Sequence, residues 1–433
     1  EEVSKLFVNG GLKIYTTMNR TMQDGVQAVL DDRSNLDVKI NGSYSEEPLT
    51  NEGVYMLQSA ATVMDYKTGE VKALIGGRGK QPANSLNRAY DDLKSIASNT
   101  KPLTVYGPAI DTKNYTAATP IDDSPLTNEE LSNFGYSFQP TNWNGVYDGL
   151  ITPREAIMYS KNITSLKVVY NLGLSTALEY GKKSGLIYNS ESSKSIATLA
   201  LGEFNNDPSD RDGGNTTILA SAYGSFGNKG IRTEAILYTK VIDSTGKVIL
   251  DKTADTTKLF SEETAYIMYD ILKGPVTGFD AGGAKFGDIP VAGKSGTTDN
   301  SDSFWFSGLT PYYSASVWIG YDMPTKLNGY SSSAASLWGD VMRVVHQGLS
   351  YKEIEKPSTV VTATVCRDSG KLATDLCAQD QRGSRVRTEY FIEGTQPTTA
   401  CDVHVTAKVN STNNKLATAS TPVRNILTKV FIK

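Results

Sequence analysis

The spacing of apolar residues along the chain predicts both strands and helices. Apolar runs of strand length at 58–65 and 71–75 are joined by the turn 67–69 and predict a hairpin. Three further runs of this kind lie at 289–296, 303–309 and 313–321. Their connections are too short for helical crossovers, so these three strands must be antiparallel.

Other segments repeat apolar residues with the spacing of a helix. Asn19 is expected to cap a helix that ends near Leu30, and Thr152 with Glu155 forms a capping box that begins a helix ending near Tyr159. Further helices are expected at 175–183, 216–226, 262–273 (closed by Gly274) and 337–347. The stretch 122–148 is rich in Asn, Pro, Ser and Gly and is expected to be a long loop with interspersed aromatic residues.

Together these elements predict an α/β chain of the α+β type, with an antiparallel sheet flanked by helices. We expect three parts. Residues 1–52 form a strand–helix linker, 53–355 form the main domain, and 356–433 form a small β-rich extension, because Thr/Val-rich strands and all the cysteines follow residue 356.

Composition narrows the class of protein. The chain has 433 residues and a net charge of −4, so we expect no nucleic-acid partner. No apolar run approaches the roughly 20 residues that cross a bilayer. The chain begins with Glu rather than Met, which suggests a soluble fragment of a longer protein, and a membrane anchor on that protein is not excluded.

Candidate catalytic groups are limited by the presence of only two histidines, His346 and His404. Neither is well placed for a Ser-His-Asp triad, because His346 lies in the expected helix 337–347. An activated serine in this chain therefore needs a lysine as its base. Ser98 and Lys101 fit this need, since they lie three residues apart where a loop enters an apolar-striped helix.

Two further motifs accompany this Ser-x-x-Lys pair. Ser160 and Asn162 form a Ser-x-Asn triplet at a helix end, and residues 294–297 read Lys-Ser-Gly-Thr on an expected strand. A set of Ser-x-x-Lys, Ser-x-Asn and Lys-Thr-Gly motifs in this order is the signature of penicillin-binding proteins and class A β-lactamases, and this chain resembles it.

The resemblance is closest to the transpeptidase region of class A penicillin-binding proteins and covers about residues 10–348. It also rests on matching stretches at 11–17, 87–89, 222–223, 227–230, 291–294, 305–306 and 308–311. The segment 366–404 resembles the C-terminal extension of some members. Two departures are modest: Asn99-Thr100 replaces a small residue plus Phe or Met, and Ser295 replaces Thr. The family's glycosyltransferase domain and membrane helix are missing from this chain.

The resemblance implies a penicillin-binding fold with an all-helical lobe, and a role for each motif. Ser98 would attack the D-Ala-D-Ala end of a peptidoglycan stem peptide, Lys101 would take the serine proton, and Ser160 would relay a proton to the leaving D-Ala. Asn162 would bind the substrate amide and hold Lys101. Lys294, Ser295 and Thr297 would bind the substrate carboxylate. The backbone N–H groups of Ser98 and Thr297 would form the oxyanion hole.

By the same resemblance, β-lactams would acylate Ser98, and the full-length protein would stand at the extracytoplasmic face of a bacterial membrane with a glycosyltransferase domain. Two alternatives keep the site: a hydrolase of the D,D-carboxypeptidase or β-lactamase type, and a non-catalytic penicillin-binding sensor. A nucleotide-binding loop ending at Lys294-Ser295 is disfavoured, since the pattern needs Gly where this chain has Asp288.

The cysteines leave two arrangements open. Cys366, Cys377, Cys401 and His404 have the residue types of a Cys₃His zinc site, with tight spacing between the last two ligands. One disulfide plus a spare thiol suits an extracytoplasmic protein at least as well, and we rank a structural zinc second. We expect catalysis to need no cofactor.

Overall fold

The computed structural model of the protein describes residue 5, residues 9–205 and residues 210–433. Its centre is a five-stranded antiparallel sheet with the order β11-β12-β13-β3-β4. The strands are β11 (Ala292–Thr297), β12 (Ser303–Leu309), β13 (Ser314–Gly320), β3 (Gln58–Met64) and β4 (Val71–Ile75). The predicted hairpin and the three antiparallel strands are confirmed, and β11 lies at one edge of the sheet.

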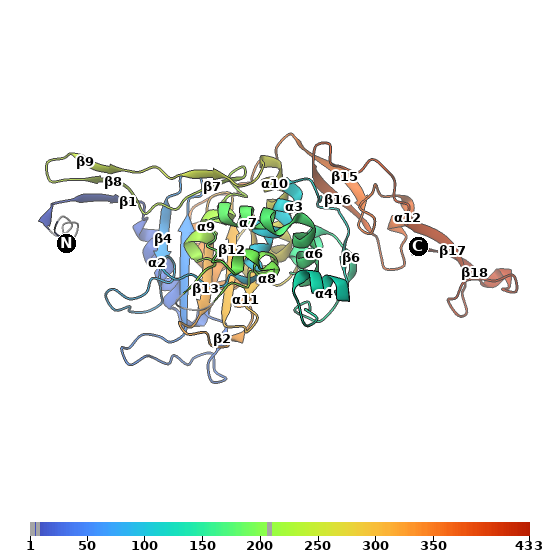
Figure 1. Ribbon diagram of the computed structural model, residues 1–433, viewed down its shortest axis with the longest axis horizontal. Coiled ribbons are helices and arrows are strands. Elements are labelled where there is room, and N and C mark those ends of the chain that lie inside the picture. The colour runs from blue at the N-terminus through green and yellow to red at the C-terminus, as the bar shows by residue number, and fades with distance from the viewer. Residues whose placement is uncertain (1–4, 6–8, 206–209) are drawn as a thin grey trace.

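Helices cover both faces of this sheet, as Figure 1 shows. Helices α2 (Arg20–Asp31) and α11 (Ser332–Val345) pack on one face, while α9 (Thr216–Gly224) packs on the other. The Asn19 side chain caps α2 by accepting a hydrogen bond from the Met22 N–H. The core on the α11 face includes Trp338 and Phe306, whose rings pack 5.3 Å apart.

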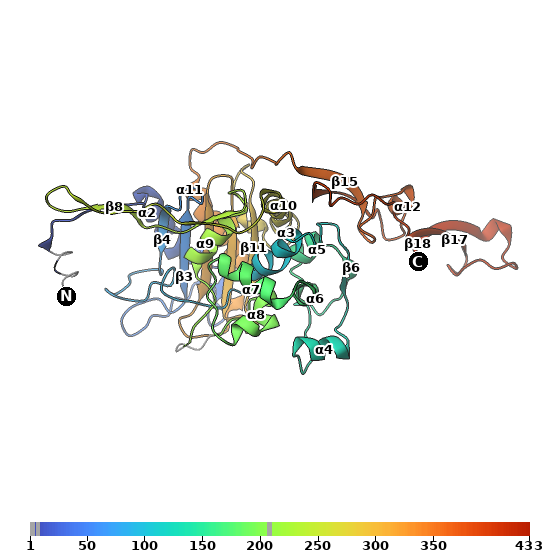
Figure 2. The ribbon, with the colours of Figure 1, turned by 45° about the horizontal axis from the view of Figure 1, so that its top comes forward.

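A helical lobe adjoins the α9 face and carries two of the three sequence motifs (Figure 2). Its helices are α3 (Gly107–Asp111), α4 (Asn128–Phe134), α5 (Pro153–Met158), α6 (Asn162–Leu172), α7 (Leu174–Lys183), α8 (Ile196–Leu201) and α10 (Glu262–Gly278). The α+β class, the antiparallel sheet and the helical lobe are therefore confirmed.

Short strands extend the two ends of the molecule. At the N-terminal end β1 (Lys13–Thr16) pairs with β8 (Tyr238–Ile242), which pairs with β9 (Val248–Asp251). The C-terminal extension holds two separate hairpins and one short helix. The first hairpin pairs β15 (Val360–Cys366) with β16 (Val386–Ile392), and α12 (Asp375–Ala378) lies between these strands in the chain. The second hairpin pairs β17 (His404–Asn410) with β18 (Ile426–Ile432). Minor pairs complete the fold: β2 (Val38–Lys39) with β14 (Asn328–Gly329), β5 (Ile121–Asp123) with β6 (Gly149–Ile151), and β7 (Ile231–Thr233) with β10 (Thr256–Lys258).

Three details of the predicted elements are wrong. The segment after Ser98 is not a regular α-helix: a 3₁₀ turn at Ala97–Thr100 passes into a π-helical turn at Lys101–Tyr106 before α3 begins. Helix α10 continues through Gly274 to Gly278, because the buried Pro275 and Val276 hold its last turn in the core. The expected loop 122–148 contains the end of β5 and the capped helix α4.

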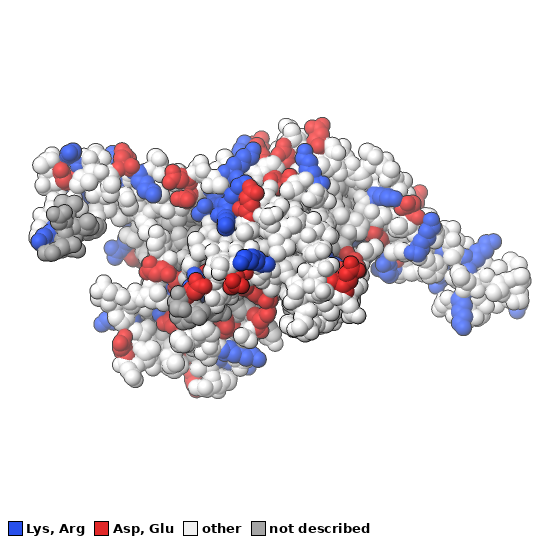
Figure 3. Space-filling view, in the orientation of Figure 1, with Lys and Arg blue, Asp and Glu red and all other residues white. Residues whose placement is uncertain are grey.

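Charged side chains of both signs lie on the surface of the main domain. Basic and acidic side chains are interspersed over the face of the main domain seen in Figure 3. Within the described ranges, no helix is both long and apolar enough to cross a membrane.

Candidate active site

Ser98 lies on a strained turn and faces a cavity. The residue before it, Ala97, has φ of +49°, a backbone conformation that a non-glycine residue rarely adopts. The Ala97 N–H donates to the Gly202 carbonyl at 3.1 Å, which anchors the turn to the end of α8. Ser98 is half-buried and lines the cavity. By contrast, the Ser95 hydroxyl is buried and donates to the Gly202 carbonyl at 2.7 Å.

Lys101 follows Ser98 by three residues and is completely buried. Its Nζ donates to the Ser160 carbonyl and to Asn162 Oδ1, each at 2.8 Å. Burial first, and then the nearby Lys294 ammonium, lower the pKa of Lys101 well below that of an ordinary lysine. The Ser98 hydroxyl is not a hydrogen-bond partner of Nζ in the described part of the chain. The Lys101 amine is thus held by two groups of the second motif, the Ser160 carbonyl and the Asn162 amide oxygen.

The second motif occupies the sharp connection between α5 and α6. Ser160 has φ of +53°, and the capping box of Thr152 and Glu155 starts α5 as predicted. Asn162 is fixed at both ends of its amide, since Oδ1 accepts from Lys101 and Nδ2 donates to the Thr141 carbonyl at 3.1 Å. An amide NH₂ carries two N–H bonds, so one remains for a ligand in the cavity.

The third motif lies on the edge strand β11. Lys294 is buried, and its Nζ donates to the Ser295 carbonyl at 2.9 Å. Burial lowers the pKa of Lys294 to about 8, with the Asp280 carboxylate opposing that shift. The Ser295 hydroxyl donates to Asp280 Oδ2 at 2.8 Å, while Thr297 is exposed at the end of the strand.

Close contact between β11 and the Ser98 turn depends on a glycine. A Cβ atom on Gly296 would lie 2.4 Å from Asn99 Nδ2 and 2.8 Å from the Ile96 carbonyl. Only glycine allows this approach, so the third residue of Lys-Ser-Gly-Thr lets the strand and the Ser98 turn lie in contact.

A cavity of about 740 Å³ collects the predicted site residues. Ser98, Ser160, Asn162, Ser295 and Thr297 line it, whereas the two lysines lie behind its wall. The structure thus brings all three motifs to one place, although nearly two hundred residues separate Ser98 from Lys294 in the chain.

Several lining residues were missed from the sequence. The Trp143 and Phe279 rings pack with centroids 5.9 Å apart, and Tyr330 and Asp280 also line the cavity. Trp143 was noted only as an aromatic in a long loop, and its Nε1 bonds the Tyr159 carbonyl at 3.0 Å. Asp280 and Phe279 had no usable signal, because the expected end of α10 at Gly274 placed them in an unassigned loop.

Two segments of the chain match known domain families. Residues 59–343 match the penicillin binding protein transpeptidase domain. Residues 356–406 match the C-terminal domain of penicillin-binding protein 1A.

Penicillin-binding proteins 1A of several clostridia are similar in sequence. The protein of Clostridium perfringens (strain ATCC 13124) is 53% identical over 95% of this chain and 49% of its own length. The protein of Clostridium botulinum (strain Langeland) is 46% identical over the whole chain and 51% of its own length. The chain thus spans about half the length of the curated relatives it matches.

Solved structures share the fold at lower sequence identity. Penicillin-Binding Protein 1A from Haemophilus influenzae aligns with a TM-score of 0.72 at 18% identity, covering 93% of this chain and 76% of that one. PonA1 from Mycobacterium tuberculosis aligns with a TM-score of 0.65 at 22% identity, covering 82% of this chain and 89% of that one. Fold, motif geometry and sequence agree, and the chain belongs to the transpeptidase family of penicillin-binding proteins.

Proposed function

We propose that this chain is a D,D-transpeptidase that cross-links peptidoglycan stem peptides through a Ser98 acyl-enzyme. The observation that carries the proposal is the pairing of a cavity-facing serine on a strained turn with a buried lysine of lowered pKa. The hydroxyl of the nearby Ser95 already donates to a backbone carbonyl. Ser98 is therefore the serine that can act as the nucleophile.

In the acylation step, Ser98 Oγ bonds to the carbonyl carbon of the penultimate D-Ala and passes its proton to the neutral Lys101 amine. The backbone N–H groups of Ser98 and Thr297 stabilise the tetrahedral oxyanion. The C–N bond to the terminal D-Ala then breaks, and Ser160 relays the proton to that leaving amine.

Substrate binding falls to the other two motifs. The free N–H of Asn162 bonds a peptide carbonyl, and the outer edge of β11 receives the extended peptide. The terminal carboxylate binds the Thr297 hydroxyl, with the Lys294 charge behind it. Ser295 joins them only by turning its single O–H away from Asp280.

In the second step, an amine of another stem peptide forms a C–N bond to the acyl carbon, the ester bond to Ser98 Oγ breaks, and the amine's proton passes to that oxygen, which leaves a cross-link and the free serine. A hydrolase of the same site would use water as the acceptor, and a sensor would stop at the acyl-enzyme. We place the whole protein at the extracytoplasmic face of a bacterial membrane, where such stem peptides occur.

The test uses a fluorescent penicillin with Ser98→Ala and Ser95→Ala, and maps the adduct by mass spectrometry. We expect Ser98→Ala to abolish labelling and Ser95→Ala to retain it wherever thermal melting shows a folded variant. Labelling of Ser98→Ala together with loss in a folded Ser95→Ala contradicts the assignment. Reaction of the wild-type chain with a thioester donor, with and without an added D-amino acid, separates transfer from hydrolysis and from an inert acyl-enzyme.

A further inference from the structure

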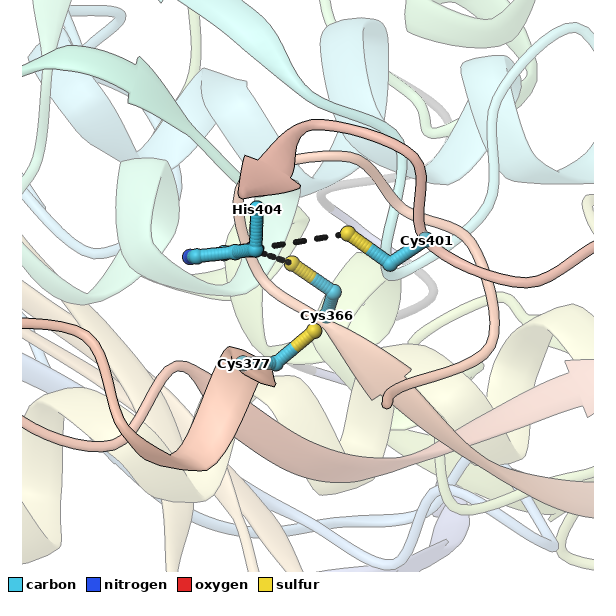
Figure 4. A group of neighbouring side chains, drawn as sticks. All are labelled: Cys366, Cys377, Cys401 and His404. Carbon is cyan, nitrogen blue, oxygen red and sulfur yellow. Dashed lines mark hydrogen bonds between the residues drawn. The ribbon is translucent and has the colours of Figure 1, made fainter. Parts of the chain in front are cut away.

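Four side chains of the C-terminal extension converge on one point, and the proposed chemistry uses none of them. The sulfur atoms of Cys366, Cys377 and Cys401 and one ring nitrogen of His404 all lie within 4.8 Å of one another. Figure 4 shows the four side chains pointing toward a shared centre from the end of β15, from α12 and from the segment that enters β17.

The distances in this cluster fit one tetrahedral metal ion. His404 Nδ1 lies 3.5 Å from Cys366 Sγ and 3.4 Å from Cys401 Sγ. With Zn–S bonds of about 2.3 Å and Zn–N bonds of about 2.0 Å, tetrahedral angles place neighbouring S and N ligands roughly 3.5 Å apart. All three cysteines are free thiols, so the arrangement of one disulfide with a spare thiol is absent from this structure.

The groups around His404 orient it as a metal ligand. Its Nε2 lies 3.0 Å from Asp380 Oδ2, which leaves the Nδ1 lone pair directed at the sulfur atoms when Nε2 carries the proton. Asp380 and Asp368 are already neutralised by Arg382 and Arg385, at 2.9 to 3.0 Å. Asp368 and Asp380 therefore form an outer shell and are not themselves ligands.

A hydrogen bond also favours Cys377 as a metal ligand. Cys377 Sγ accepts a hydrogen bond from the Thr374 N–H at 3.3 Å across the first turn of α12. Donors of this kind stabilise a thiolate, which is the form that binds a metal.

In the part of the chain that the structure describes, the extension has a small apolar core of its own, although Val360 and Ile392 pack into the core of the helical lobe. The apolar cluster inside it has three buried members, Ala118, Val365 and Phe391, and one of these belongs to the helical lobe. The hairpins β15–β16 and β17–β18 are separate two-stranded sheets. Segments with so small a core usually need a disulfide or a metal to stay folded.

We propose that Cys366, Cys377, Cys401 and His404 bind one zinc ion that joins β15, α12 and β17 into a single folded unit. Four protein ligands close the coordination sphere, so the ion is structural and takes no part in acyl transfer. Three thiolates and a neutral imidazole make a ligand set that favours zinc over Mg²⁺ or Ca²⁺.

The test measures zinc and thiols in the whole chain, purified with a reductant and without chelator. We expect one zinc per chain by plasma mass spectrometry, and three thiols titrating when a mercurial reagent releases the metal. Replacement by Co²⁺ should give the charge-transfer and d–d bands of a tetrahedral thiolate site. One thiol with no zinc would show a disulfide and overturn the proposal, as would three thiols in a chain that binds no zinc after equilibration with it.

Variants separate this site from the acylation site. Cys377→Ser should lose bound zinc and open the extension to proteolysis, while Asp375→Asn, exposed two residues away, should keep one zinc per chain.

Asp380→Asn should weaken zinc binding about 10- to 100-fold in chelator competition, because it loosens the His404 ring. Ser98→Ala should retain its zinc, so failure of the acyl-enzyme proposal would leave this one standing. Equal zinc affinity in Asp380→Asn and wild type would refute the outer-shell role.

Discussion

Lys101 Nζ donates a 2.8 Å hydrogen bond to Asn162 Oδ1, which joins the buried lysine to a residue that lines the cavity Ser98 faces. An amide oxygen accepts this bond without adding charge, so the lysine is held in place while burial keeps its pKa low. The identity of residue 162 therefore affects both the position and the protonation of the proposed base.

Asn162→Asp should slow penicillin acylation and move the acidic limb of its pH profile upward, because a carboxylate beside Lys101 raises the pKa of the amine. Asn162→Ala should slow acylation about 10- to 100-fold without that shift, as a buried donor left unpaired costs about 1–3 kcal/mol. Stopped-flow acylation across pH measures both. Asn171→Ala, on the same helix and far from the cavity, is the control, and matching pH profiles for Asn162→Asp and wild type would contradict this view.

Gly202 supports the Ser98 turn through its backbone. A Cβ atom there would lie 2.1 Å from the Ala97 carbonyl oxygen, and Gly202 has φ of +76°. Gly202→Ala should therefore displace the turn, lower stability by about 1–3 kcal/mol and slow acylation more than tenfold. Gly135→Ala is a matched control, since Gly135 has φ of +74° with open space around it. Denaturant unfolding and acylation rates check the pair, and equal acylation by both variants would refute the steric argument.

The site was predictable from the sequence to the extent that its motifs are local. Ser98 and Lys101 lie within one turn, and Thr152 and Glu155 mark the helix that leads to Ser160, so short patterns located them. The partners of those residues come from distant segments: Gly202, Asp280 and Trp143 reach the site only through tertiary packing. Helix α10 shows the same limit, because burial of Pro275 overrides the helix-stop signal of Gly274.

Glu203 should make stability depend on pH. Burial, together with Asp299, raises the pKa of Glu203 to about 7 from an ordinary value of 4.5. The folded protein then binds the proton more tightly than the unfolded chain, so this group destabilises the fold progressively as pH rises from 4.5 through 7. Glu203→Gln should melt above wild type at pH 8 and close to it at pH 4.5, measured by scanning calorimetry.

The same variant should also affect Lys101, because the Glu203 carboxylate favours the charged form of that lysine. Its removal should move the acidic limb of the acylation profile to lower pH. Glu52→Gln, in an exposed loop, should change neither property. A melting difference for Glu203→Gln that is the same at both pH values would contradict the assigned titration.

The C-terminal extension is tied to the active-site lobe by the ion pair of Arg154 and Glu389. Arg154 Nη2 lies 2.6 Å from Glu389 Oε2 and 2.7 Å from Asp270 Oδ2, and the Glu389 side chain is 1% exposed. Arg154 is in α5, the helix that ends just before Ser160. A change in the extension can therefore reach the second motif through one helix.

Glu389→Ala should destabilise the chain by about 3 kcal/mol, because truncating one member of a buried pair leaves the other charge poorly compensated. The double variant Arg154→Met/Glu389→Met should recover part of that loss, because no guanidinium is then left without Glu389, while the Asp270 carboxylate that loses Arg154 is partly exposed to water. Glu179→Gln, which breaks an exposed pair with Lys183, should cost less than about 1 kcal/mol. Urea unfolding of all three variants provides the comparison. If Glu389→Ala costs no more than Glu179→Gln, the ion pair does not hold the extension against α5.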